Sequence, residues 1–201
     1  MLDWLRRIRK VSQKLTLPSR DATAGRSQIQ LNPAKLTPSS EIQLAYLAEL
    51  GGVISDLCDQ DSQKAPLPEQ AKKQAKIAAD YRDRSKQLDA MLIRSGENRM
   101  DVQSDMRERL DQLVIRTEGA DWHEDLMRIY VVFGILQDSA QRVSKGLAPN
   151  KRIKTEQLFD AKQLQDFCFH ELAAGIANDA DLAPRLAMFG RMVVGDALLE
   201  I

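Results

Sequence analysis

The sequence predicts an all-α protein built as an antiparallel bundle of long helices. Three observations lead to this prediction. Apolar residues recur every three to four positions along most of the chain, which is the period of an amphipathic helix. Aromatic residues make up only 5% of the 201 residues, and runs of the residues that favour strands are scarce. The helical stretches are joined by short connections, for which antiparallel packing is the economical arrangement.

The N-terminal part, residues 1–37, is expected to be a basic amphipathic arm followed by a linker. The first fifteen residues contain one acidic residue, Asp3, against five basic ones, which are Arg6, Arg7, Arg9, Lys10 and Lys14. Apolar residues recur among them at helical spacing. Such an arm could bind a polyanion, either RNA or anionic lipid, dock on a partner, or pack one stripe on the bundle. Residues 17–40 are rich in Pro, Ser, Gly and Thr, a composition typical of linkers.

Residues 38–201 are expected to form the bundle. The first helix is predicted to begin with Thr37 as its N-cap and Pro38 in its first turn. Its buried face is predicted to hold Ile42, Tyr46, Leu50, Val53 and Leu57. Gly51 and Gly52 lie inside this helix, where each costs about 1 kcal/mol relative to alanine, and they indicate a close helix crossing or a bend.

The second helix is predicted to run from Pro68 to Ser95 and to end at Gly96, a favoured helix terminator. Its apolar positions are Ala71, Ala75, Ala78, Tyr81, Leu88 and Leu92. Asp80 and Asp83 project about 130–170° away from the centre of that face, at 100° per residue. We therefore expect them to form surface ion pairs with Lys76, Arg84 and Lys86, rather than half of a metal site.

A third helix is predicted over residues 101–119, with an apolar face formed by Val102, Met106, Leu110 and Leu113. The fourth helix follows Asp121, and Glu124 three residues later completes a variant of the capping box, so Glu124 is expected to cap the helix. Its apolar stripe comprises Trp122, Leu126, Ile129, Phe133, Leu136, Ala140 and Val143. Val131 and Ile135 lie on the opposite side, which indicates burial all round or a subunit contact.

The fifth helix is predicted to start near Thr155 and the last helix near Asp181, which would cap it. The fifth buries Leu158, Ala161, Leu164, Phe167, Cys168 and Leu172, whereas His170 and Asp166 face outward. The last helix, residues 182–201, is an addition to the four long helices of the bundle.

Composition and motifs exclude several classes of function. The formal net charge is zero, so bulk electrostatics do not indicate a nucleic-acid-binding protein. Cys58 and Cys168 lie in apolar helical stretches and are expected to be buried structural thiols in a reducing compartment. No apolar run approaches the roughly 20 residues of a transmembrane helix, and the N-terminus lacks the features of a secretory signal, so a cytoplasmic protein is expected. Motifs of nucleotide binding, zinc binding and serine hydrolases do not occur.

Two stretches of the C-terminal half, "ADWHEDLMRIYV" and "DLAPRLAMFGRMVVGDAL", carry a family resemblance, and "AYLAEL" at residues 45–50 fits more loosely. Residues 41–201 resemble the actinobacterial ferritin-like proteins that are related to tRNA hydroxylases. The resemblance implies a ferritin-like antiparallel four-helix bundle. It also implies a di-iron centre held by Glu and Glu-x-x-His ligands, which activates oxygen and hydroxylates a hypermodified tRNA adenosine.

The ligand positions that the resemblance implies hold few residues that bind iron. Glu49 matches the carboxylate of the first helix. The remaining ligand positions fall on Tyr81, Arg84, Phe133, Ala161 and Leu164. His123 and His170 match no ligand position. We therefore expect a divergent, non-catalytic relative without a cofactor, which acts as a binding or interaction bundle, as a homodimer or with a protein partner. The alternative is a di-iron monooxygenase whose two iron ions are held in a different ligand register.

Overall fold

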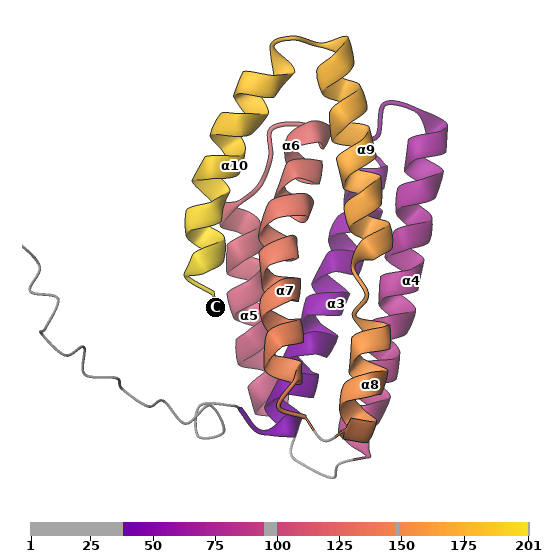
Figure 1. Cartoon of the computed structure of the whole chain (residues 1–201), viewed down its shortest axis with the longest axis vertical. Helices are drawn as coiled ribbons and strands as arrows, with labels where there is room; N and C mark the ends of the chain where they lie inside the picture. The colour runs from indigo at the N-terminus through magenta and orange to yellow at the C-terminus, as the bar shows by residue number, and fades with distance from the viewer. Residues whose placement is uncertain (1–37, 95–99, 148, 201) are drawn as a thin grey trace, which may run out of the picture. The chain divides into compact units, whose positions relative to one another are not determined.

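The computed structural model of the protein describes residues 38–94, 100–147 and 149–200, and the side chains of residues 100–102 are not described (Figure 1). They belong to one compact unit, Ala34–Ile201. The predicted basic arm, with Arg6, Arg7, Arg9, Lys10 and Lys14, lies outside the described residues, and so does Thr37.

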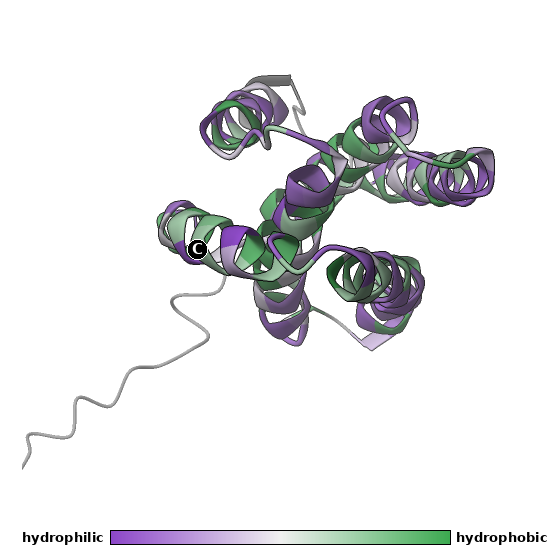
Figure 2. Cartoon of the chain, turned by 90° about the horizontal axis from the view of Figure 1, so that it is seen from above, coloured by the Kyte–Doolittle hydropathy of each residue, from purple (hydrophilic) through white to green (hydrophobic). Residues whose placement is uncertain are grey.

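The described residues form helices and contain no strand, which confirms the all-α prediction. The helices are α3 (Ser40–Ser62), α4 (Pro68–Ile93), α5 (Met100–Arg116), α6 (Trp122–Arg128), the π-helical turn η1 (Ile129–Phe133), α7 (Gly134–Ser144), α8 (Pro149–Leu158), α9 (Lys162–Asn178) and α10 (Leu182–Leu198). Helix α3 packs mainly on α4 and α5, whereas α6 and η1 pack on α9 and α10. Figure 2 gives the view along the bundle, with most helices seen close to end-on. No helix among the described residues has both the length and the apolar character that a membrane crossing requires.

Helix α3 begins at Ser40, because the Ser39 hydroxyl accepts a hydrogen bond from the Ile42 amide at 3.4 Å and acts as the N-cap. The prediction of Thr37 as the cap is therefore wrong. Leu50, Val53 and Leu57 of the predicted face are buried as expected. Ile42, however, is 39% exposed and Tyr46 is only half-buried. Both residues line an open pocket near the start of α3.

The crossing of α3 and α4 is close, as the two glycines of α3 predict. A Cβ added to Gly51 would lie 3.5 Å from the Ser85 Cβ, which is ordinary contact distance. Side chains also bridge the two helices: the Ser85 hydroxyl donates to the Ala48 carbonyl and the Ser55 hydroxyl to the Ala78 carbonyl, both at 2.8 Å. Small residues thus let the two backbones approach and hydrogen-bond through serines.

The fourth predicted helix is continuous but contains the π-helical turn η1. This wider turn adds a residue to the helical repeat, so Val132 is buried together with Ile129 and Phe133. Val143, predicted on the buried stripe, is 38% exposed. Val131 remains half-buried.

The fifth predicted helix is two helices, α8 and α9, because the chain leaves helical geometry between Leu158 and Lys162. Helix α8 begins at Pro149, so the predicted start near Thr155 is wrong. The Asp160 carboxylate accepts the Lys162 amide hydrogen at 3.0 Å, a local bond that competes with helix continuation. Ala161 is consequently a half-buried N-cap residue of α9, not a position inside a helix. Asp181 precedes α10 as predicted, but its side chain makes no capping hydrogen bond.

Candidate functional site

The bundle interior holds the positions at which the resemblance places di-iron ligands. Tyr81, Phe133 and Leu164 come from α4, η1 and α9, and each is at most 2% exposed. Glu49 is half-buried on α3. Iron in such a centre requires several carboxylate and imidazole ligands, and these buried phenol, phenyl and aliphatic groups supply none.

The two predicted ligand positions of α4 make structural contacts. The Gln137 amide nitrogen donates to the Tyr81 hydroxyl at 2.7 Å, and burial raises the pKa of Tyr81 to about 12. The Arg84 guanidinium lies 5.1 Å from the centre of the Tyr81 ring and donates to the Asp160 carbonyl at 2.6 Å. Arg84 thus holds the α8–α9 break against α4, instead of the predicted pair with Asp80.

The remaining predicted positions also lack the geometry of a metal centre. Ala161, predicted to face inward, is half-buried at the start of α9. Asp83 is exposed and lies 3.8 Å from Lys86, as predicted for a surface pair, and Asp80 is half-buried. In the described part of the chain, no group of three or more His, Cys, Asp or Glu side chains could hold a metal ion. The residues present therefore do not fit a di-iron centre.

A buried ionic cluster that the sequence analysis missed joins α3 to α6. One terminal nitrogen of Arg128 lies 3.2 Å from an Asp61 oxygen and 3.0 Å from an Asp125 oxygen, and all three side chains are at most 3% exposed. Lys64 reaches Asp125 at 2.7 Å. The sequence signal for this cluster was the position of two charged residues beside the predicted apolar stripe of the fourth helix: Asp125 directly precedes Leu126, and Arg128 directly precedes Ile129.

The carboxylates of Asp61 and Asp125 share the guanidinium of Arg128, and Lys64 adds a second positive charge at Asp125. Burial raises the pKa of Asp61 to about 6; Arg128 opposes the shift, and the negative charge of Asp125 adds to it. The Nε atom of Arg128 is buried without a hydrogen-bond partner.

Both cysteines are fully buried free thiols, as predicted. Burial raises the thiol pKa of Cys58 and of Cys168 well above the ordinary value. These thiols therefore stay protonated and behave as small apolar groups.

The predicted cap of the fourth helix is confirmed. The Asp121 carboxylate accepts the amide hydrogens of His123 and Glu124, each at 3.0 Å, and Glu124 accepts the Ala120 amide hydrogen at 2.8 Å. Arg185 of α10 donates to Glu124 at 2.8 Å, so the cap also fixes the start of α10 against α6.

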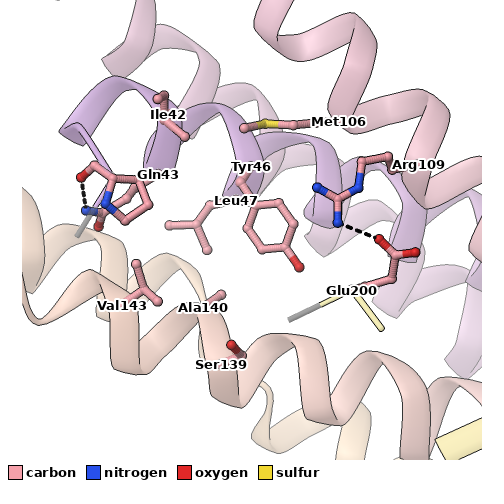
Figure 3. A pocket seen from close by; sticks show the side chains of 11 residues that line it. Ile42, Gln43, Tyr46, Leu47, Met106, Arg109, Ser139, Ala140, Val143 and Glu200 are labelled. Atoms are coloured by element: carbon pink, nitrogen blue, oxygen red, sulfur yellow. Dashed lines mark hydrogen bonds and ion pairs between the residues drawn. The ribbon is translucent and has the colours of Figure 1, made fainter. Parts of the chain in front are cut away.

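An open pocket of about 200 Å³ lies between α3, α5, α7 and Glu200, which follows α10 (Figure 3). We call it the α3 pocket. Its wall is mostly apolar, with Ile42, Leu47, Met106, Ala140 and Val143. Its polar residues are Gln43, Tyr46, Ser139, Arg109 and Glu200. Burial, together with the charge of Glu200, raises the pKa of Tyr46 to about 12.

Helix α10, all of whose residues are described, carries an apolar outer face. Its exposed large side chains are Met188, Met192 and Leu198, and Leu199 follows directly after the helix; they are 55–77% exposed. Arg185 and Asp196 pair with other helices, so Arg191 is the one charged residue on the exposed side of α10. A surface helix normally has a charged outer side, and this one does not.

The described residues thus form a helical bundle with a close α3–α4 crossing and a π-turn in its fourth long helix. A family model described as a ferritin-like domain of actinomycetes matches residues 43–200. The chain belongs to that family. A search of curated proteins found no match.

Proposed function

We propose that this ferritin-like domain is a divergent, non-catalytic relative of the tRNA hydroxylases that works as an interaction bundle without a di-iron centre. The observation that carries the proposal is the filling of the bundle interior at the expected ligand positions. Tyr81, Phe133 and Leu164 occupy the space between the helices, and the buried acids Asp61 and Asp125 are bound to Arg128.

The iron content of the purified full-length protein tests this proposal. We expect far less than one iron ion per chain after expression in iron-replete medium, and no absorption band of an oxo-bridged iron pair. A Glu49→Gln variant serves as the matched control, and its iron content should equal that of the wild type. A content of about two iron ions per chain that falls in Glu49→Gln would contradict the proposal and support the alternative. That alternative is a di-iron monooxygenase acting on a hypermodified tRNA adenosine.

The apolar outer face of α10 supports the interaction role, and the partner that it fits is a second copy of this chain. Figure 1 places α10 at one edge of the bundle. Two α10 helices can pair in antiparallel orientation about a two-fold axis that passes midway between the levels of residues 193 and 194. In this pair, Met192 lies opposite Gly195 of the second copy. Met188 then lies level with the second copy's Leu199. Among the described residues, a Cβ added to Gly195 would meet nothing within 4 Å, so this glycine leaves space for the Met192 side chain of a second copy.

The oligomeric state, measured by light scattering coupled to size-exclusion chromatography, tests the second-copy proposal. We expect a dimer for the wild type and a monomer for Met192→Glu, because the two-fold axis makes each substitution count twice. Ile153→Glu is the matched control, since Ile153 is 54% exposed on α8 and should leave the dimer intact. A monomeric wild type, or a dimeric Met192→Glu variant, would refute this interface.

The basic arm is proposed to bind a polyanion, which the five basic residues of its sequence support. Binding to anionic vesicles and to RNA should fall as salt rises, because counterions are released on binding. Binding that persists after deletion of residues 1–37 would remove this role.

A further inference from the structure

The α3 pocket is concave and apolar where a bundle of this kind would normally be filled. Ile42 and Val143 belong to the predicted buried faces of their helices, yet they are 39% and 38% exposed. They line the same pocket, together with Met106 and Ala140. A concave apolar surface with a few polar groups is the usual character of a small-molecule site.

One wall of the pocket contains a buried polar atom that lacks a partner. Gln43 is only 5% exposed. Its amide nitrogen donates to the Pro38 carbonyl at 2.7 Å, which fixes the orientation of the side chain. Its amide oxygen is buried and accepts no hydrogen bond. This oxygen has almost no accessible surface, so a molecule in the open pocket does not reach it, and Gln43 contributes to the wall by packing and not as an acceptor.

The opposite part of the pocket offers hydroxyl groups. The Tyr46 hydroxyl points into the open space toward Ser139 (Figure 3). Because its pKa is raised to about 12, this phenol keeps its proton at neutral pH and can donate a hydrogen bond. The pocket thus presents a hydrogen-bond donor at Tyr46 to the oxygen of a ligand.

The charges at the pocket are balanced within the protein. Glu200 accepts from Arg109 at 2.9 Å and from Arg116 at 3.0 Å. Arg116 also lies 3.4 Å from Asp196. Two cations and two anions therefore neutralise one another, and a charged ligand would find no unpaired counter-charge among the described residues that line the pocket. This balance favours a neutral ligand.

We propose that the α3 pocket binds a neutral, mainly apolar small molecule that carries a hydroxyl or amide group. A cavity of about 150 Å³ accommodates benzene, so the roughly 200 Å³ available here suits one six-membered ring with one or two further heavy atoms. The α3 pocket shares no lining residue with the expected iron ligands or with the apolar outer face of α10.

The test uses two probes of nearly equal shape, benzyl alcohol and toluene, added to the ¹⁵N-labelled full-length protein and followed by amide chemical shifts. Benzyl alcohol should shift the amides of Gln43, Tyr46 and Ala140 in a saturable manner. Toluene should bind about tenfold more weakly, because it lacks the one hydrogen bond that the pocket can add.

Variants distinguish a built site from unspecific apolar binding. Tyr46→Phe should reduce the affinity for benzyl alcohol severalfold while leaving that for toluene nearly unchanged, because only the alcohol accepts a hydrogen bond from the Tyr46 hydroxyl. Tyr130→Phe is the matched control, because Tyr130 is half-buried outside this pocket. Shifts that map elsewhere, an absence of saturable shifts, or a benzyl alcohol affinity unaffected by Tyr46→Phe would each overturn the proposal.

Discussion

Replacement of Arg128 by methionine removes the guanidinium that lies between two buried carboxylates and keeps an unbranched apolar side chain. Asp61 and Asp125 are 1% and 0% exposed. Removing one partner of a buried ion pair costs about 3–5 kcal/mol, because the remaining charge is left uncompensated. Lys64 remains 2.7 Å from Asp125, so we expect a loss near the lower limit, about 3 kcal/mol. That loss is a large part of the roughly 5–15 kcal/mol that stabilises a typical domain.

The destabilisation caused by Arg128→Met should depend on pH, and the titration of Asp61 determines whether it grows or shrinks as the pH rises. Its pKa is about 6 in the folded protein against an ordinary value of 3.8. A raised folded-state pKa means that its stabilising contribution is fully present below about pH 4 and is lost as the pH rises through about 6. In Arg128→Met the attraction that opposes this rise is gone, so the pKa of Asp61 rises further. The free energy of unfolding that the variant loses relative to the wild type should therefore be smaller at about pH 5 than at about pH 7.5.

Urea unfolding followed by circular dichroism measures both effects, with wild type, Arg128→Met and the double variant Asp61→Asn/Arg128→Met compared at each pH. The double variant should regain part of the loss at the higher pH, because it lacks one of the uncompensated carboxylates. A deficit below about 1 kcal/mol in Arg128→Met, the range of a surface pair, would refute the reasoning. An equal deficit at both pH values would refute the role given to Asp61.

Three further predictions concern packing and buried groups. Gly119→Ala should lower the free energy of unfolding by about 1–3 kcal/mol, because its Cβ would lie 2.7 Å from the Asp125 backbone nitrogen and force a shift. Gly52→Ala should instead raise it by about 0.5–1 kcal/mol, since the added Cβ would meet only contacts of 3.7 Å or more; urea unfolding compares the two, and an equal effect would contradict the contact distances. Ellman's reagent should find no reactive thiol in the native protein and two in urea, because Cys58 and Cys168 are buried; rapid native labelling would contradict that burial. Tyr81→Phe should cost about 1–3 kcal/mol, because it leaves the buried Gln137 amide without the hydroxyl to which it donates, and a neutral effect in urea unfolding would show that this bond is dispensable.

Helix positions and faces were largely predictable, because they depend on residues three and four apart. The stripe from Trp122 to Ala140 and the cap at Asp121 follow from local spacing, and both were predicted. The inward positions of Tyr81, Phe133 and Leu164 follow from the same helical spacing of apolar residues. The break before Lys162 was missed because a single carboxylate, Asp160, competes there with an otherwise continuous apolar pattern.

The sequence alone thus determined that this chain forms amphipathic helices and which side of most of them is apolar, because helical periodicity is written in neighbouring residues. Only the tertiary structure decided which charges are buried, since Asp61 and Arg128 are 67 positions apart and each is tolerated inside only because the other lies opposite. It also decided that Ile42 and Val143 line an open pocket instead of the core. Whether an apolar face is covered depends on the shapes of the helices packed around it, and no local pattern records that fit.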